Sequence, residues 1–80
     1  MGRTKEEQFL IRLYEVATRG GDSLGVVNRY DIGKAVGISP KSIDTMCKQL
    51  MRTNFIKRDG EIDVHLTPHG EKLVHSILKE

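Results

Sequence analysis

The stretch VGISPKSIDTMCKQLMRTNFIKRDGEIDVHLTPHG, residues 36–70, carries three structural signals in close succession. Ser39 and Pro40 indicate a helix start, because serine caps free N–H groups and proline at the first helical position loses no hydrogen bond. Alternating apolar and polar residues then indicate strands, and Thr67 with Pro68 repeats the helix-start signal. A helix, a hairpin and a second capped helix predict a unit that presents one helix on a small scaffold.

A first helix is predicted upstream of this stretch. Thr4 followed by Glu7 has the spacing of a capping box, in which each side chain satisfies a free backbone N–H of the first turn. Gly20-Gly21 ends the helical pattern, because glycine is favoured just past a helix C-terminus. The apolar residues at helical spacing are Phe9, Leu10, Leu13, Val16 and Ala17.

A short strand and a second helix are expected between the first helix and residue 37. Residues 26–28 can supply the strand, and Asn28 with Asp31 repeats the capping-box spacing. The short helix then runs from about 29 to 36, with Gly37 as its stop. The predicted order along the chain is helix, short strand, helix, helix, strand, strand, helix.

Length and composition restrict the class of protein. A chain of 80 residues buries about 60% of the surface that its unfolded form exposes, which suits one domain over residues 1–80. A hydrophobic share of 38% and a charged share of 30% are typical of a globular domain. No apolar run approaches the roughly 18 residues of a spanning helix, and no secretion signal is evident, so we expect a cytoplasmic protein without membrane contact. A net charge of +2 permits nucleic-acid binding.

The predicted third helix, residues 40–53, has two distinct faces at 100° per residue. Its apolar face consists of Ile43, Cys47 and Leu50, with Met46 and Met51 at the margins. The opposite face, called the cationic face below, consists of Lys41, Thr45, Lys48 and Arg52, flanked by Ser42 and Gln49. Its three charges are positive, and Asp44 lies off it. Such a face suits contact with a polyanion, although a solvated or protein-binding surface has the same pattern.

The hairpin, residues 55–66, is predicted to have one dry face, to which Ile62, Val64 and Leu66 point. A two-residue loop places Ile56 opposite Asp63. A three-residue loop of Arg58, Asp59 and Gly60, with Gly60 at positive φ, places Ile56 opposite Ile62. We favour the longer loop because it pairs two apolar residues.

The segments DIGKAVGISPKSIDTMCKQLMRTNFIKR, residues 31–58, and VHLTPHGEKL, residues 64–73, resemble the winged helix-turn-helix of MarR-type and related small prokaryotic transcription regulators. NFIKR stands where the family usually has Gly-Leu-Ile-x-Arg, and LTPHG matches Leu-Thr-x-x-Gly. The resemblance implies an α+β fold with a three-helix core, a two-stranded hairpin wing and a C-terminal helix. It also implies that the third helix enters the major groove of double-stranded DNA and that the wing lies along the backbone or minor groove.

The resemblance also assigns roles to particular residues. Lys41, Ser42 and Thr45 are expected to face base edges, and Gln49 adds an amide that pairs with adenine. The residues expected near phosphates are Asn28, Arg29, Ser39, Lys48 and Arg52, with Lys57 and Arg58 on the wing.

The sequence departs from the family pattern at several positions. Thr45 stands where the family often has arginine, and Asp44 brings a negative charge close to phosphates. The wing between residues 57 and 63 carries two positive and three negative charges, a net of −1, which favours phosphate contact little. Asn54 replaces the usual glycine after the helix, and asparagine adopts the left-handed conformation more readily than most residues.

Few residues indicate other chemistry. Cys47, the one cysteine, lies on an apolar face and is expected to act as a small hydrophobe. His65, His69 and His75 lack metal spacing as a set, although the first two are placed to approach each other across the strand end. We discern no catalytic triad, carboxylate pair or ligand pocket, and expect no enzymatic activity, metal or cofactor.

The predicted fourth helix has an apolar stripe of Leu73, Val74, Ile77 and Leu78. Two of these residues can complete the core against the first helix. The others are expected to extend into a partner, which indicates a homodimer.

The sequence therefore favours a sequence-specific double-stranded DNA-binding protein, a transcription regulator that reads the major groove with its third helix. The alternative is a winged-helix module that binds proteins in a larger assembly without contacting DNA. The acidic wing and the small net charge suit this alternative.

Overall fold

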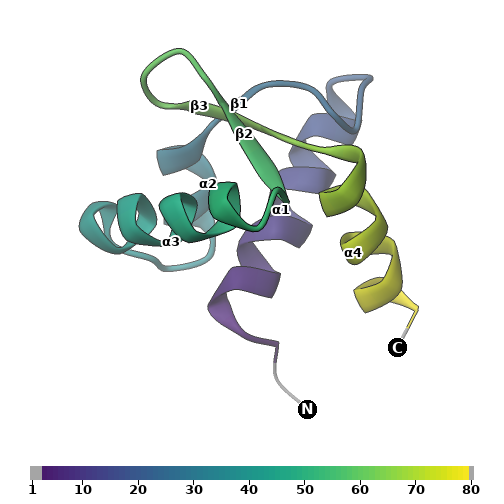
Figure 1. Ribbon diagram of the computed structural model, residues 1–80, viewed down its shortest axis with the longest axis horizontal. Helices are drawn as coiled ribbons and strands as arrows, with labels where there is room; N and C mark the ends of the chain where they lie inside the picture. Colours follow the sequence, from purple (N-terminus) through teal and green to yellow (C-terminus); the bar gives the residue numbers. More distant parts are fainter. Residues whose placement is uncertain (1–2, 80) are drawn as a thin grey trace.

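The computed structural model describes residues 3–79 and confirms the predicted order of elements. Figure 1 shows the elements, and their bounds are α1 (Lys5–Arg19), β1 (Val27–Asn28), α2 (Arg29–Ala35), α3 (Pro40–Arg52), β2 (Ile56–Asp59), β3 (Asp63–Leu66) and α4 (Pro68–Leu78). The strands form an antiparallel sheet in the order β1-β3-β2. The α+β class and the winged arrangement of helices and hairpin are as predicted.

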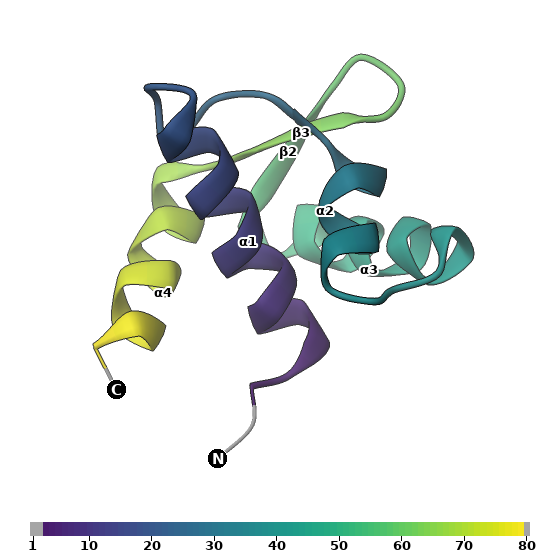
Figure 2. The same cartoon turned by 180° about the vertical axis from the view of Figure 1, so that it is seen from behind.

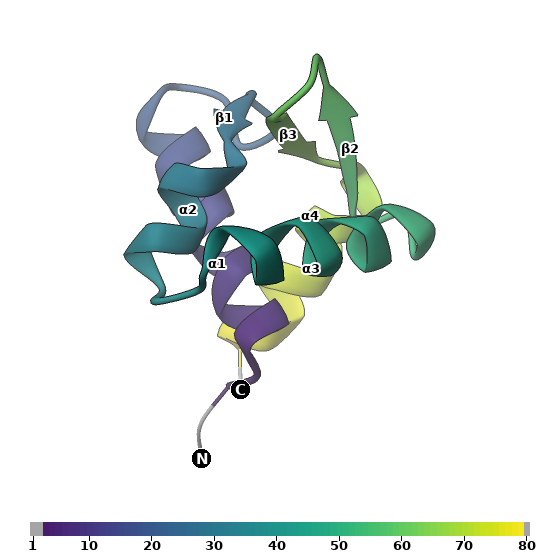
Figure 3. The same cartoon turned by 90° about the vertical axis from the view of Figure 1, so that its left-hand side faces the viewer.

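Helix α1 lies at the centre of the fold. Figure 2 shows α4 on one side of it and the α2–α3 pair on the other. In Figure 3 helix α3 crosses the front of the molecule, and within the described part of the chain no other element covers its outer side. The hairpin of β2 and β3 rises beside α3, so the fold presents one helix and one wing.

The helix ends explain why the sequence divides into these elements. The Thr4 capping box forms as predicted, and Ser39 and Thr67 cap α3 and α4 ahead of their first-turn prolines. The first three helices end in the same backbone motif, in which the residue after the C-cap has positive φ and the next N–H bonds back five residues. The positive-φ residues are Gly21 at 102°, Gly37 at 75° and Asn54 at 64°.

One expected cap differs in detail. The Asn28 side chain accepts a hydrogen bond from the N–H of Tyr30, at 2.8 Å, rather than from Asp31. Asn28 therefore caps α2 through an Asx-turn, in which the side chain bonds the N–H two residues later. Its short side chain reaches this N–H more directly than the N–H of Asp31.

The core gathers apolar residues from every helix and from the hairpin. Its fully buried members include Phe9, Leu10, Leu13, Ile32, Ile43, Cys47, Ile56, Val64, Leu66 and Val74. Helices α2 and α3 approach closely where Gly33 faces Ile43, because a Cβ at residue 33 would lie 2.0 Å from Ile43 Cδ1. Because residue 33 has no Cβ, the Ile43 side chain packs directly on the backbone of α2, and this contact sets how closely α3 lies against α2.

The predicted hairpin register is wrong. Ile56 pairs with Leu66 rather than Ile62, and the loop consists of Gly60, Glu61 and Ile62, called the wing loop below. Ile62 is 40% exposed instead of facing the dry side. A shift by an even number of residues keeps every β2 side chain on its original face, so alternation alone does not distinguish the two registers. Gly60 has the expected positive φ, at 79°.

Candidate nucleic-acid interface

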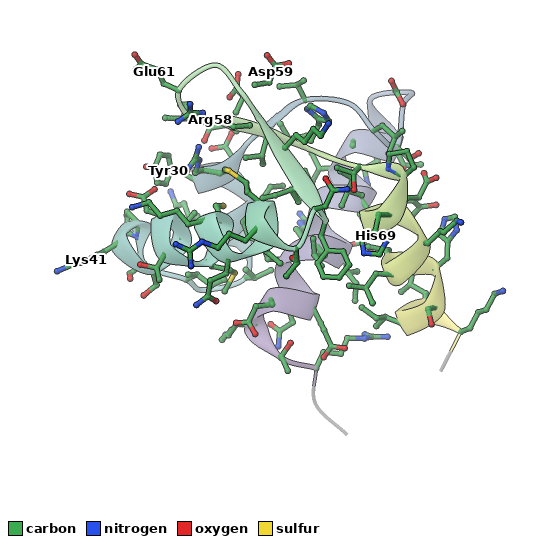
Figure 4. All side chains as sticks on the ribbon, in the orientation of Figure 1. Tyr30, Lys41, Arg58, Asp59, Glu61 and His69 are labelled. Carbon is green, nitrogen blue, oxygen red and sulfur yellow. The ribbon has the colours of Figure 1, made fainter. Side chains whose placement is uncertain are left out.

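The cationic face of α3 is exposed along its whole length. Ile43, Cys47 and Leu50 point into the core, as the periodicity predicted. The exposed residues are Lys41, Ser42, Thr45, Lys48, Gln49 and Arg52. Figure 4 shows Lys41 at the free end of the helix, pointing away from the body of the protein. The fold therefore presents three cations on one helix without burying or pairing them within the described residues.

Asp44, the one acidic residue of α3, has its carboxylate occupied by groups from α2. Tyr30 Oη donates a hydrogen bond of 2.7 Å to Asp44 Oδ1, and Arg29 Nη1 lies 3.7 Å from the same oxygen. The bond to Asp44 raises the pKa of the Tyr30 hydroxyl, and partial burial raises it further. The negative charge that the sequence placed near the cationic face is thus held toward α2 and opposed by a guanidinium.

The polar side chains of the cationic face have defined hydrogen-bonding capacity. Ser39 Oγ donates to Ser42 Oγ at 3.0 Å, which leaves the Ser42 hydroxyl proton available as a donor. Thr45 Oγ1 donates to the Lys41 carbonyl at 3.3 Å and therefore offers lone pairs to an outside donor. Together with the Lys41 amine and the Gln49 amide, the helix presents both hydrogen-bond donors and acceptors, the two kinds of group that base edges pair with.

An open groove separates the cationic face from the first turn of α1. Lys5 and Glu6 line one side of it, and Lys41, Ser42, Thr45 and Gln49 line the other. Lys5 Nζ donates to the Val36 carbonyl at 3.1 Å and so places a further cation beside α3. Sequence reasoning missed Lys5, because its place beside α3 depends on a contact across 31 residues.

The wing carries both signs of charge on its surface. Lys57 and Arg58 are exposed on β2, and Figure 4 shows Asp59 and Glu61 toward the end of the hairpin. Asp59 pairs with Asp63 across the strands, which places two carboxylates opposite each other. The wing therefore presents acidic groups beside its two cations.

Two residues that were expected near phosphates, Asn28 and Arg29, use their side chains for hydrogen bonds within the protein. Asn28 uses its side chain to cap α2. Arg29 is only 7% exposed, and its guanidinium donates to carbonyls of the wing loop. We correct the assignment of Arg29, because a guanidinium enclosed by protein carbonyls and Asp44 does not face an outside phosphate. The sequence carried a signal of this burial. Arg29 lies three and four positions before the buried residues Ile32 and Gly33, which places it on the same face of α2.

The histidines and the cysteine lie away from the cationic face. The His69 ring stacks on Phe55 with centroids 4.7 Å apart, and His75 contacts Tyr14 edge to face at 5.4 Å. Within residues 3–79 no group of three or more His, Cys, Asp or Glu side chains is arranged to hold a metal ion. Burial raises the pKa of the Cys47 thiol to about 11, so it stays protonated at neutral pH.

Helix α4 divides its apolar stripe between core and surface. Val74 and Ile77 are buried, at 0% and 3% exposure. Leu73 is half-buried against the core, and Leu78 is 46% exposed. Val74 and Ile77 are therefore core residues, and Leu78 is the member of the stripe that a partner can reach.

Comparison with known proteins identifies the fold. No family model matches the sequence, and no curated protein matches it. Among solved structures, the crystal structure of a MepR mutant from a multidrug-resistant S. aureus clinical isolate is similar, with a TM-score of 0.72 and 22% sequence identity. The match covers 98% of this chain and 56% of that one, so the chain spans little more than half of that MepR chain. The fold is that of a MarR-like winged helix.

The helices within residues 3–79 are too short or too polar to cross a bilayer.

Proposed function

We propose that this protein binds double-stranded DNA in a sequence-specific manner and regulates transcription, with α3 in the major groove. The observation that carries the proposal is the cationic face, which is exposed and rigidly mounted, and whose neighbour Asp44 is bonded to Tyr30 and faces Arg29. DNA carries a dense array of phosphates, and neutralising them with lysine and arginine supplies most of the non-specific affinity.

Rigid mounting matters because base recognition requires side chains at defined positions. The Ser39 cap fixes the start of α3, and the close contact between Gly33 and Ile43 fixes its depth. In this proposal Lys41, Ser42, Thr45 and Gln49 read bases. Ser39, Lys48 and Arg52 contact phosphates, and Lys5 adds a phosphate contact beside the groove.

The wing has a smaller part in this proposal. Lys57 and Arg58 supply backbone contacts, while the carboxylates of Asp59 and Glu61 repel phosphates at close range. The affinity of the protein for DNA therefore depends mainly on α3.

We also propose that the protein acts as a homodimer in which Leu78 contributes to the contact between copies. Leu78 is 46% exposed on α4, which lies on the side of α1 away from α3. A dimer formed there leaves both cationic faces free. Two recognition helices of such a dimer engage half-sites about one helical turn, roughly 34 Å, apart.

The second candidate function is a protein-binding module, and the wing is the observation that favours it. Ile62 is 40% exposed at the wing loop and has the acidic residues Glu61 and Asp63 on either side. An apolar side chain with an acidic surround suits a basic protein surface better than it suits DNA.

Chemical-shift mapping with a mixed-sequence duplex distinguishes the two functions. Uniformly labelled protein is titrated with duplex at low salt, and the backbone amide shifts are followed for every element. DNA binding predicts concerted shifts in residues 39–52 and at Lys5, with α4 as the internal control. Absence of shifts in α3 at low salt, where electrostatic binding is strongest, contradicts the proposal and favours the protein-binding module.

A further inference from the structure

Arg29 joins three parts of the fold that are distant in sequence. Its side chain begins at the first residue of α2, where its backbone N–H also lies 3.4 Å from the Ile62 carbonyl. Its Nε donates to the same carbonyl at 2.8 Å, and its Nη2 donates to the Glu61 carbonyl at 3.1 Å. Its Nη1 faces Asp44 of α3 at 3.7 Å. One guanidinium therefore contacts both the wing loop and the recognition helix.

The chemistry of this contact depends on the arginine side chain. A guanidinium holds five donors in a rigid plane, which allows simultaneous bonds to two neighbouring carbonyls and a carboxylate. A lysine ammonium at the same place has one nitrogen and cannot reproduce that fork. The Arg29 side chain is 8% exposed, so water replaces these partners poorly.

Apart from the Arg29 side chain, the wing loop is held from outside the hairpin by the Arg29 backbone N–H, which bonds the Ile62 carbonyl, and by β1, where Asn28 pairs with Asp63 beside the loop. Gly60, Glu61 and Ile62 are all exposed, and they lie beyond the last ladder pair of Asp59 with Asp63. That pair places two carboxylates opposite each other, which weakens the end of the ladder. An exposed loop on a short hairpin is expected to move unless something outside the hairpin fixes it.

We propose that Arg29 is the positioning residue that fixes the wing loop relative to α3, because its side chain contacts both. The inference rests on the proposed function only for its consequence in DNA binding. The anchoring itself is a property of the free protein.

Loss of this anchor has two effects on a DNA-binding surface. The wing loop becomes free to move, so binding must order it again, and that ordering lowers affinity. Asp44 also loses its cationic partner, and its side chain is already 49% exposed. Both effects act without removing any group that contacts DNA.

The test compares Arg29→Lys and Arg29→Met with Arg19→Lys and Arg19→Met. Arg19 is exposed at the end of α1 and provides the same changes of shape and charge far from the wing. Arg29→Lys retains a cation opposite Asp44, so we expect this variant to fold. It allows the test to be made even if Arg29→Met unfolds. In the free protein, backbone order parameters of residues 60–62 are expected to fall from about 0.85 to below about 0.6 in the Arg29 variants alone. Order parameters that stay at the wild-type value overturn the inference.

The DNA measurement uses the same proteins with a labelled duplex. Arg29→Lys conserves charge, so we expect about tenfold weaker binding with an unchanged salt dependence, whereas the Arg19 variants bind as wild type does. Unchanged affinity in a protein whose wing loop has become mobile overturns the positioning role. A wild-type protein that binds no duplex overturns the proposed function and the role in recognition, while the order parameters still decide whether Arg29 anchors the wing.

Discussion

Replacing Gly33 by alanine tests the contact that positions α3. The added Cβ would lie 2.0 Å from Ile43 Cδ1 and 2.4 Å from Ile43 Cγ1, whereas carbon atoms in contact prefer roughly 3.5–4.0 Å. Ile43 is 1% exposed, so any rotation of its side chain must be accommodated inside the core. Helix α3 must therefore move away from α2 or the core must distort.

The expected magnitude follows from two opposing effects. Overpacking of a core costs about 1–3 kcal/mol, and this overlap is large enough for the upper part of that range. Alanine gains about 1 kcal/mol of helix propensity over glycine, which partly offsets the cost. We expect the free energy of unfolding to fall by about 2 kcal/mol.

Urea unfolding of four proteins measures this effect. They are wild type, Gly33→Ala, Ile43→Ala and the double variant. Ile43→Ala alone should cost about 2–5 kcal/mol because it leaves a cavity. In the double variant the new methyl group occupies part of that cavity. The loss of unfolding free energy in the double variant should therefore be smaller than the sum of the losses in the two single variants, by at least about 1 kcal/mol.

Ala35→Gly serves as the control for propensity, because Ala35 is an exposed residue of the same helix. A Gly33→Ala protein at least as stable as wild type, with additive costs in the double variant, would refute the close approach of α2 and α3.

Three further predictions concern recognition, the cysteine and oligomerisation. Lys41→Ala and Thr45→Ala should each change the DNA sequence that is selected from random duplexes. If both variants select the wild-type motif, neither residue reads bases. For Cys47 the folded pKa, about 11, lies above the ordinary value of 9.0, so its contribution to stability is present below pH 9 and is lost as the pH rises toward 11. The free energy of unfolding, measured for wild type and Cys47→Ala across that pH range, should fall more steeply with pH in wild type. Equal slopes for the two proteins would contradict this prediction. Leu78→Glu should shift sedimentation toward monomer without unfolding the domain, whereas a wild-type monomer at high micromolar concentration would exclude the dimer.

Local signals in the sequence predicted most of the fold. Ser39-Pro40 and Thr67-Pro68 locate helix starts because capping chemistry acts within one turn. The two faces of α3 also followed from periodicity, since Ile43 and Leu50 are buried and Lys48 is exposed. These features depend on residues that are close in sequence.

The features that the sequence did not predict depend on distant contacts. The position of the wing loop is one, because its register is compatible with alternation in two ways and Arg29 bonds the loop from 33 residues away. The capture of Asp44 by Tyr30 is another, because it requires α2 and α3 to pack at a particular distance. Periodicity places a residue on a face but does not identify its partner.

The salt dependence of DNA binding tests the central claim most directly. The affinity for a labelled duplex is measured over a range of salt concentrations for wild type, for Lys48→Ala with Arg52→Ala, and for the control Lys72→Ala with Lys79→Ala at α4 and its C-cap. All four residues are exposed, so each double variant loses the same charge. We expect the slope of log affinity against log salt to fall by about 1.8 in the α3 variant, at about 0.9 per phosphate contact, and to stay unchanged in the α4 variant. Equal slopes in the two variants, or no salt-dependent binding by wild type, would contradict the assignment of α3 to DNA.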